Sequence, residues 1–332
     1  MKLSEIINPL EKVFPKSNME EWDNVGLMIG DRDMEIKKIQ ISLDVTMNVI
    51  DNAIKNNVDL IISHHPFIFN PIKNINTDSL LGRKILKLIE NKIAVYSLHT
   101  NLDSSKKGLN DFVGGILGLK NGKIIDPVKE NYYKAVFTTY DIEKAENELK
   151  KEGINFDINS DKKFILVLKK DKLYNVIEKL KTKSLVNDDI NIIKLENSYG
   201  DNGIGRIYSL EERTELSRII EEVKERFEIK SVVVSGNNIE EAIIKKIAIV
   251  NGAGSSYWKK AKRMGADLLI TGDLKYHEAL DAKEEGMYIM DIGHYESERF
   301  FYNVILNELK SVVKNGSLEI SVYNDEPVLK KM

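Results

Sequence analysis

Apolar and polar residues alternate along the first third of the chain in blocks that predict strands and helices in turn. Short apolar runs rich in β-branched residues predict strands at 38–45, 59–63 and 93–99. Segments with apolar residues three and four positions apart predict helices between them, at 46–57 and 78–92. A strand–helix–strand–helix–strand series is typical of a parallel sheet with helices on both faces, so we expect an α/β fold.

The last third of the chain carries a second series of the same kind. Its pattern predicts strands at 244–250, 267–272 and 287–293, helices at 256–265 and 276–286, and a long helix at 295–314. The two series also agree in register, because IKKI at 36–39 recurs at 244–247 and DLIIS at 59–63 recurs as DLLIT at 267–271, each 208 positions later. This agreement suggests an internal duplication, although short apolar strands also resemble one another by chance.

The segment between the two series differs from both in composition and pattern. From about Tyr132 to Leu195 it is rich in lysine and asparagine, and its pattern predicts the order βαββαβ of a ferredoxin-like unit. It contains none of the histidines. We therefore expect two related α/β halves with mostly parallel sheets, residues 1–130 and 197–332, which form one domain interrupted by a ferredoxin-like insert at 131–196.

Composition excludes several classes of protein and site. The 332 residues (37.9 kDa) include no cysteine, which rules out disulfides, thiolate nucleophiles and cysteine-based zinc or iron–sulfur sites. The net charge of −3 gives no overall attraction to nucleic acid, and the lysine-rich insert is more typical of a solvated face. Charges interrupt the amino-terminal apolar residues, and no run approaches the roughly 18 apolar residues of a membrane-spanning helix. We therefore expect a cytoplasmic protein with no membrane partner.

Histidine is scarce in this chain, and four of its five histidines fall where predicted strands end. His64 and His65 follow the second strand, His99 closes the third, and His294 follows the last strand of the second series. Open α/β sheets bind ligands beyond the carboxyl ends of their strands. These four side chains therefore lie at the edge where an active site is expected.

Two of these histidines are followed four residues later by a carboxylate. Asp103 follows His99 and Glu298 follows His294, a spacing that puts both side chains on one side of a helical turn. Imidazole and carboxylate together suit divalent Zn, Fe, Mn, Co or Ni. Each half offers too few ligands for a closed site. The two halves facing each other could hold two ions, with Glu298 as a bridge between ions roughly 3.5 to 4 Å apart.

The alternative is that these histidines have structural roles. His64, His65 and Pro66 could form a capped turn, and His99 and His294 could be hydrogen-bonded core residues. For any one histidine alone, this structural interpretation is favoured. Four histidines at strand ends, two of them with an acid at the same spacing, favour a metal site.

Short motifs in both halves carry a resemblance to a known family. They are EWDNVGL at 21–27, SHHP at 63–66, HTNLD at 99–103, DNGIGRI at 201–207, NGAGS at 251–255, TGD at 271–273 and GHYESE at 293–298. In this order and combination they resemble the GTP cyclohydrolase 1 type 2 homologs, the NGG-interacting-factor-three-like family. The resemblance implies a dinuclear metal site formed by His64, His65, Asp103, His294 and Glu298, with His99 close by and available as a further ligand.

The resemblance also implies how the chain assembles. It implies a ring-shaped homohexamer whose metal sites face an internal cavity, and some family members carry an insert at the same point in the chain. One departure stands out, because long-form members have a histidine-containing motif near the end of the insert, whereas residues 184–195 here contain no histidine. A function that depends on that motif is not expected in this chain.

Two functions of different classes are compatible with these observations. The first is a metal-dependent hydrolase, in which a water activated by two ions attacks C8 of GTP or the phosphorus of another nucleotide or phosphoester, with His99 transferring the proton. The second is a non-catalytic metal-binding regulatory protein whose insert is a platform for a ligand or partner. Turnover by the metal-loaded protein separates the two.

Three weaker signals lie near the predicted site. The glycine-rich segment 252–256 lies between a predicted strand and a helix, where backbone N–H groups could hold a phosphate, but a simple tight turn is at least as well supported. Asp23 could orient a ligand histidine through its second ring nitrogen. Asp44 ends the first strand, and we interpret it mainly as a cap for the helix that starts near Thr46, with a role in the site as the minority interpretation.

Overall fold

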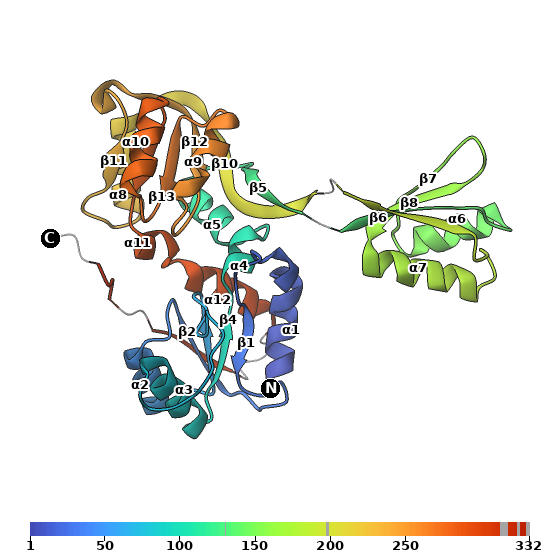
Figure 1. Cartoon of the computed structure of the whole chain (residues 1–332), viewed down its shortest axis with the longest axis horizontal. Helices are drawn as coiled ribbons and strands as arrows, with labels where there is room; N and C mark the ends of the chain where they lie inside the picture. The colour runs from blue at the N-terminus through green and yellow to red at the C-terminus, as the bar shows by residue number, and fades with distance from the viewer. Residues whose placement is uncertain (130, 197–198, 313–317, 324–325, 330–332) are drawn as a thin grey trace. The chain divides into compact units, whose positions relative to one another are not determined.

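The chain forms two compact units, one of Met1–Pro127 with Asp201–Met332 and one of Val128–Gly200. The computed structural model describes residues 1–129, 131–196, 199–312, 318–323 and 326–329. The larger unit is a mixed α/β structure with two sheets, and the smaller unit contains one sheet (Figure 1). None of the helices in the described residues is both long and apolar enough to cross a bilayer.

The first sheet of the larger unit has five strands in the order β1-β4-β3-β2-β15. Their bounds are β1 Gly26–Ile29, β2 Lys38–Ser42, β3 Leu60–Ser63, β4 Ala94–Ser97 and β15 Glu319–Val322. Strands β15, β2, β3 and β4 are parallel, and β1 is antiparallel to β4. Strands β2, β3 and β4 are the three that the hydrophobic pattern predicts, whereas the edge strands β1 and β15 are not among the predicted elements.

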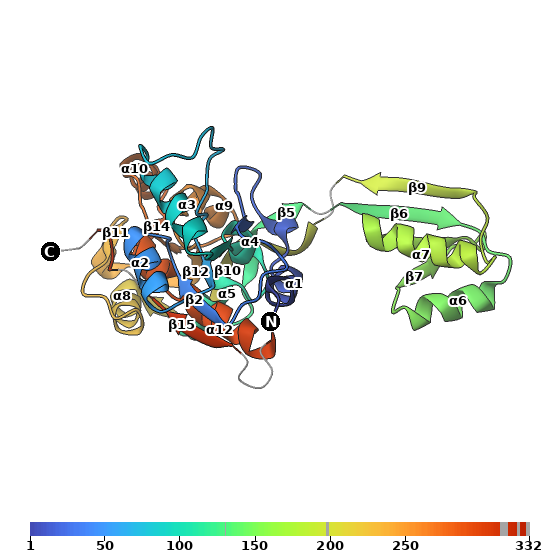
Figure 2. The same ribbon diagram turned by 90° about the horizontal axis from the view of Figure 1, so that it is seen from below.

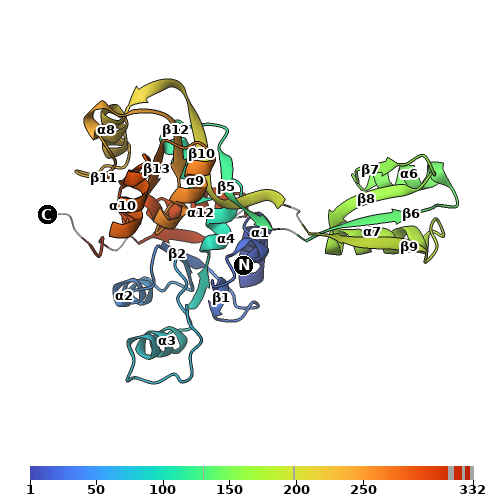
Figure 3. The ribbon, with the colours of Figure 1, turned by 45° about the horizontal axis from the view of Figure 1, so that its top comes forward.

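Helices cover both faces of this first sheet (Figure 3). They are α2 Met47–Lys55 and α3 Leu80–Glu90 on one face, and α1 Leu3–Val13 and α12 Phe301–Val312 on the other. Successive residues of a strand point to opposite faces. Ile61 therefore packs with α2 and α3, whereas Leu60 and Ile62 pack in the cluster that contains α1 and α12.

The second sheet has six strands in the order β11-β14-β13-β12-β10-β5. Their bounds are β5 Lys123–Lys129, β10 Tyr199–Glu215, β11 Val233–Ser235, β12 Ile243–Ile249, β13 Leu268–Thr271 and β14 Tyr288–Asp291. Strands β12, β13 and β14 are parallel, while β10 and β11 are antiparallel to their neighbours β12 and β14. Helices α9 Trp258–Arg263 and α10 Tyr276–Glu284 pack on one face, and α5 Leu109–Ile116 and α8 Leu216–Arg226 on the other.

One hydrophobic core joins the two sheets of the larger unit. It contains Ile39 and Ile62 from the first sheet together with Ile247 and Ile270 from the second, and all four are at most 3% exposed. Burial of apolar surface stabilises a fold by roughly 25 cal/mol per Å². A shared core of this kind fixes the two sheets, and the loops at their ends, relative to each other.

The two sheets repeat the same local contacts 208 positions apart. The carboxylate of Asp59 accepts hydrogen bonds from the backbone N–H groups of residues 37 and 38, and that of Asp267 accepts them from residues 245 and 246. The strand register repeats as well, because Ile39 lies beside Leu60 and Ile247 lies beside Leu268.

The prediction of one long helix at 295–314 is wrong, because the structure has two helices in this segment. Helix α11 (His294–Glu298) ends before a turn at Arg299 and Phe300, and α12 begins at Phe301. The ring of Phe300 packs against Phe112 and Phe227, and the Arg299 side chain donates to the carbonyl of Phe227. These contacts hold the turn, so that α11 faces the ends of the strands while α12 packs on the first sheet. The last two residues of the predicted helix lie outside the described residues.

In its described residues, the smaller unit has four antiparallel strands and two helices in the chain order β6-α6-β7-β8-α7-β9. The bounds are β6 Tyr132–Phe137, α6 Ile142–Lys151, β7 Phe156–Ile158, β8 Phe164–Lys169, α7 Lys170–Thr182 and β9 Ile190–Leu195. The strands pair in the order β7-β8-β6-β9, and both helices lie on one side of the sheet (Figure 2). Phe137, Phe164 and Leu166 form its core with Leu149 and Leu173 from the helices.

Candidate metal centre

Loops from both sheets of the larger unit bring the predicted site residues together. His64 and His65 follow β3, His99 follows β4 and precedes the short helix α4 (Thr100–Ser104), and His294 is the first residue of α11 after β14. Among the described residues, three overlapping groups could each hold a metal ion, with ligand atoms within 4.8 Å of one another. They are His64 with His65 and His99, His65 with His294 and Glu298, and His64 with Asp103 and Glu298.

The four histidines of this cluster share one pattern of hydrogen bonding at Nδ1. His64 Nδ1 lies 2.8 Å from the carbonyl oxygen of Leu98, and the other three rings each meet a carboxylate. The pairs are His65 with Asp44 at 2.8 Å, His99 with Asp23 at 2.9 Å and His294 with Asp273 at 2.7 Å. A partner at Nδ1 fixes the ring and leaves Nε2 as the ligand atom, which is the usual arrangement around a metal-binding histidine.

Glu298 lies at the centre of the cluster with its two oxygens facing different histidines. Oε2 is 2.9 Å from His65 Nε2 and 3.0 Å from His294 Nε2. Oε1 is 3.7 Å from His64 Nε2, which is itself 3.8 Å from Asp103 Oδ2. The i,i+4 spacing of His294 and Glu298 places both on α11 as predicted from the sequence.

Two buried atoms in this cluster indicate whether the side chains present would suit a bound ion. Nε2 of His64, which is 0% exposed, and Oδ1 of Asp103 have no hydrogen-bond partner among the described residues. A buried polar atom without a partner costs roughly 1–3 kcal/mol. Both atoms are chemical types that coordinate divalent transition metals, so the donor set fits an ion that His64 and Asp103 would help to hold.

Burial and neighbouring charges shift the pKa values of three groups in the cluster, Asp103, Glu298 and His64. Burial raises the pKa of Asp103 well above its usual range, and the charge of Glu298 adds to the effect. Burial also opposes ionisation of Glu298, but the surrounding histidines outweigh it and hold the pKa of Glu298 well below its usual range. Burial lowers the pKa of His64, which favours the neutral ring that binds metals.

His65 and His294 differ from His64 because carboxylates flank both of their ring nitrogens. Burial alone would lower the pKa of His65, but Glu298 and Asp44 raise it to about 10. Burial likewise opposes the charge on His294, but Glu298 and Asp273 raise its pKa to about 9. Both rings are therefore protonated at both nitrogens and positively charged at neutral pH, unless an ion displaces one of the protons.

His99 is held at the edge of the cluster by Asp23. Burial raises the pKa of Asp23, but hydrogen bonds with His99 and Thr100 outweigh it and bring the pKa below its usual range. The same carboxylate accepts a hydrogen bond from the backbone N–H of Thr100 at 3.1 Å, the first residue of α4. Asp23 thus orients His99 through its second ring nitrogen, the contact expected from the sequence.

Two other carboxylates meet histidines of the cluster, and only one of them, Asp44, has a role in the site among the interpretations of the sequence, as the minority one. Asp44 pairs with His65, and the cap of α2 is provided by the side chain of Thr46, so the interpretation of Asp44 as the helix cap is wrong. Asp273 was not singled out by spacing, since it meets His294 only through the tertiary fold. Its sequence signals are its position directly after the strand at 267–272 and its place in the TGD motif at 271–273.

The glycine-rich segment after β12 forms a tight turn against the cluster. The backbone N–H of Gly252 donates to Ser297 Oγ at 2.9 Å, and that of Gly254 donates to Thr271 Oγ1 at 3.0 Å. These two groups are therefore not free to bind a phosphate, which supports the simple-turn interpretation. Gly252 has φ +61°, and a Cβ there would lie 2.1 Å from Glu298 Oε1, so the turn allows the backbone to approach the cluster closely.

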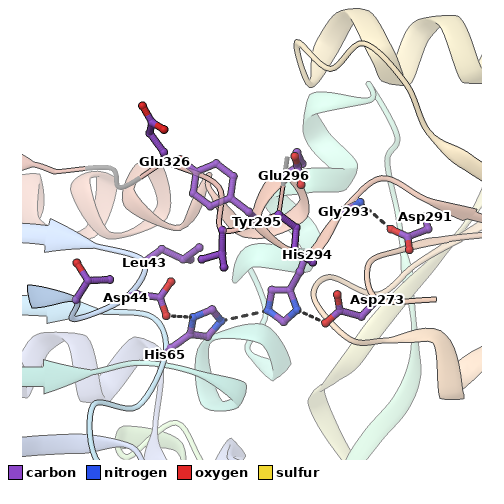
Figure 4. A pocket seen from close by; sticks show the side chains of 13 residues that line it. Leu43, Asp44, His65, Asp273, Asp291, Gly293, His294, Tyr295, Glu296 and Glu326 are labelled. Atoms are coloured by element: carbon purple, nitrogen blue, oxygen red, sulfur yellow. Dashed lines mark hydrogen bonds and ion pairs between the residues drawn. The ribbon is translucent and has the colours of Figure 1, made fainter. Parts of the chain in front are cut away.

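A cavity of about 730 Å³ opens beside the cluster, with His65 and His294 in its lining (Figure 4). Five carboxylates also line it, whereas no lysine or arginine does so in the part of the chain that the structure describes. The acidic residues are Asp44, Asp273, Asp291, Glu296 and Glu326. The cavity gives a small molecule access to the two histidines.

Comparisons with known proteins agree with the sequence motifs. The family model for Duf34/NIF3 (NGG1p interacting factor 3) matches residues 1–327. Proteins named GTP cyclohydrolase 1 type 2 homolog are 37% identical in Clostridium perfringens, over 90% of this chain and 87% of that protein, and 31% identical in Bacillus subtilis, over 97% and 95%. The family predicted from the motifs is confirmed.

Two solved structures share the fold of this chain. The crystal structure of Staphylococcus aureus protein SA1388 has a TM-score of 0.84 at 27% identity, and the match covers 100% of this chain and 99% of that one. Reduced HcgD from Methanocaldococcus jannaschii has a TM-score of 0.66 at 27% identity, over 97% of both chains.

Proposed function

Because the chain belongs to the Duf34/NIF3 family, we propose that it is a metal-dependent hydrolase with two divalent ions bound by the histidine–carboxylate cluster. The observation that carries this proposal is the position of Glu298, which is shared by two of the groups that could hold an ion. Glu298 would bridge the ions, with His65 and His294 on one side and His64 and Asp103 on the other. Zn, Fe, Mn, Co and Ni all suit this donor set.

The residues of the chain have separate tasks in this proposal. Two bound divalent ions supply Lewis-acid activation of a water and stabilise negative charge on the substrate. Asp44 and Asp273 orient His65 and His294 through Nδ1. Asp23 orients the His99 ring, whose side chain is 15% exposed. A ring held in one orientation at the edge of the cluster is suited to transfer a proton.

The substrate class rests on the names of the relatives. Because these relatives are named GTP cyclohydrolase 1 type 2 homologs, GTP is the first substrate to test, followed by other nucleotides and phosphoesters. The attacked atom would be C8 of guanine in GTP or phosphorus in a phosphoester.

Turnover by metal-loaded protein tests the proposal directly. We expect hydrolysis of GTP or a phosphoester by the unmodified chain, and a loss of at least about 100-fold in His65→Ala, because the substitution removes a ligand. His277→Ala is the matched control, since His277 is exposed on α10 outside the cluster. Equal rates in His65→Ala and the unmodified chain would rule out the hydrolase. Metal binding without any turnover would favour the non-catalytic regulatory function.

Metal affinity should increase with pH. The pKa values of about 10 for His65 and about 9 for His294 lie above the ordinary value, so both rings are protonated at pH 7 and an ion must displace their protons. Each displaced proton strengthens apparent binding about tenfold per pH unit until the pKa is reached. Competition with a chelator between pH 6.5 and about 8.5 measures this, and an affinity that stays level over that range would contradict it.

We also propose the finer architecture expected from the sequence, namely two related α/β halves with a ferredoxin-like insert. The recurrence of the Asp59 and Asp267 hydrogen bonds and of the strand register supports the duplication. The family resemblance supports a cytoplasmic, ring-shaped homohexamer, for which light scattering would give six chain masses. A monomer mass would contradict that assembly.

A further inference from the structure

An exposed aromatic pair lies beside the candidate metal centre and has no part in the proposed function. Trp22 is 58% exposed and Phe69 is 44% exposed, and their ring centroids are 5.9 Å apart at an angle of 49°. The rings of Trp22 and His99 meet at 5.9 Å in a T-shaped contact. His99 is in turn 5.3 Å from His64 and 5.7 Å from His65, centroid to centroid. The exposed rings of Trp22 and Phe69 are therefore linked to the histidine cluster through the contact of Trp22 with His99.

The neighbours of Trp22 along the chain hold this turn in place although its ring faces solvent. Asp23 is hydrogen-bonded to His99 and to Thr100, which ties the turn to the start of α4. The Asn24 side chain donates to the carbonyl of Ile68 at 2.6 Å, which ties it to the loop that carries Phe69. A large apolar side chain that is both exposed and fixed is typical of a surface that a ligand covers.

We propose that Trp22 and Phe69 form an aromatic platform on which the planar heteroaromatic ring of the substrate stacks. Trp22 provides the stacking face, and Phe69, tilted against it, provides a side wall. This inference rests on the proposed function, because it places the edge of a stacked ring next to His99 and the bound ions. Stacking on an aromatic side chain tolerates different rings, so the platform selects for a planar heterocycle rather than for one base.

The charge around the cluster supports recognition through the ring. The described lining of the cavity beside His65 and His294 has five carboxylates and neither lysine nor arginine, so a phosphate group there would depend on the bound ions to neutralise its charge. Uncharged nucleosides are therefore the appropriate probes for the platform.

The two tryptophans of the chain make the platform observable. Trp258 is 3% exposed, so the variant Trp258→Phe leaves Trp22 as the single tryptophan, in a solvent-facing position. We expect guanosine and adenosine to quench its fluorescence saturably, and ribose, which has no planar ring, to leave it unchanged. Absence of quenching by both nucleosides would overturn the proposal. Blue-shifted emission that moves to the red on dilution would also overturn it, because a second copy of the chain would then cover Trp22.

Calorimetry on the otherwise unmodified chain tests the same inference without Trp258→Phe. Guanosine binding should weaken at least about tenfold in Trp22→Ala and stay within about threefold in Trp22→Tyr, which keeps a stacking ring. Tyr276→Ala is the matched control, because Tyr276 is 76% exposed on α10 and its ring contacts His277. Unchanged binding in Trp22→Ala would overturn the platform. The metal content of the same samples should be equal in all variants, and it reports separately on the proposed function.

Discussion

Replacing Glu298 with glutamine is expected to remove bound metal and abolish turnover while the fold is retained. The change keeps the size of the side chain but removes the charge that faces His65 and His294 at 2.9 and 3.0 Å and His64 at 3.7 Å. Loss of a residue that only orients a ligand typically weakens metal binding 10- to 100-fold. Loss of a bridging ligand should cost more, so we expect affinity to fall by more than about 100-fold. Elemental analysis after dialysis and a turnover assay measure the two effects.

Glu296→Gln is the matched control for this substitution. Glu296 lies on the same helix α11 and lines the cavity, but it belongs to none of the three groups that could hold an ion. It should keep its metal, and both variants should keep the circular dichroism of the unmodified chain. If Glu298→Gln retained a full complement of ions, the bridging role of Glu298 would be excluded.

The second large effect is expected at Gly252, where alanine should displace Glu298. A Cβ at this position would lie 2.1 Å from Glu298 Oε1, well inside van der Waals contact, and 3.6 Å from a ring carbon of His294. The carboxylate must move away from the histidines to relieve the clash. We expect bound metal to fall to a small fraction of that in the unmodified chain, although no ligand has been changed.

Gly118→Ala separates this clash from backbone strain. Gly252 and Gly118 both have positive φ, +61° and +69°, so alanine costs each roughly 1–2 kcal/mol of stability. A Cβ at Gly118 meets nothing within 4 Å. Thermal unfolding should therefore show the loss from backbone strain alone in Gly118→Ala and a larger loss in Gly252→Ala, which also carries the clash, and only Gly252→Ala should lose metal. Equal metal content in the two variants would show that moving the Glu298 carboxylate does not weaken metal binding.

The sequence predicts the parallel centres of both sheets because buried strands leave a strong local signal. Strands β3 and β13 are uninterrupted apolar runs bounded by turns, and the structure has them where the pattern predicts. The turn at Phe300 was missed because its cause is tertiary. The apolar spacing continues through it, and only the packing of Phe300 on Phe112 and Phe227 divides the helix.

The candidate site was predictable as far as it depends on strand ends. His64, His65, His99 and His294 all follow buried strands, so topology alone brings them to one edge. Their carboxylate partners show the limit of this reasoning. Asp44 and His65 are joined by contact between two loops, and no spacing distinguishes Asp44 from an ordinary helix cap. Partners of this kind become visible only when side-chain positions are known.

Elemental analysis of the unmodified chain shows whether the histidine–carboxylate cluster holds two ions. The protein is purified, loaded with Zn²⁺ or Mn²⁺ above pH 8, dialysed, and analysed for its elements. Because Glu298 is shared by two groups that could each hold an ion, we expect two ions per chain to survive dialysis. A chain that retains no transition metal after this treatment would exclude a dinuclear metal site in this cluster.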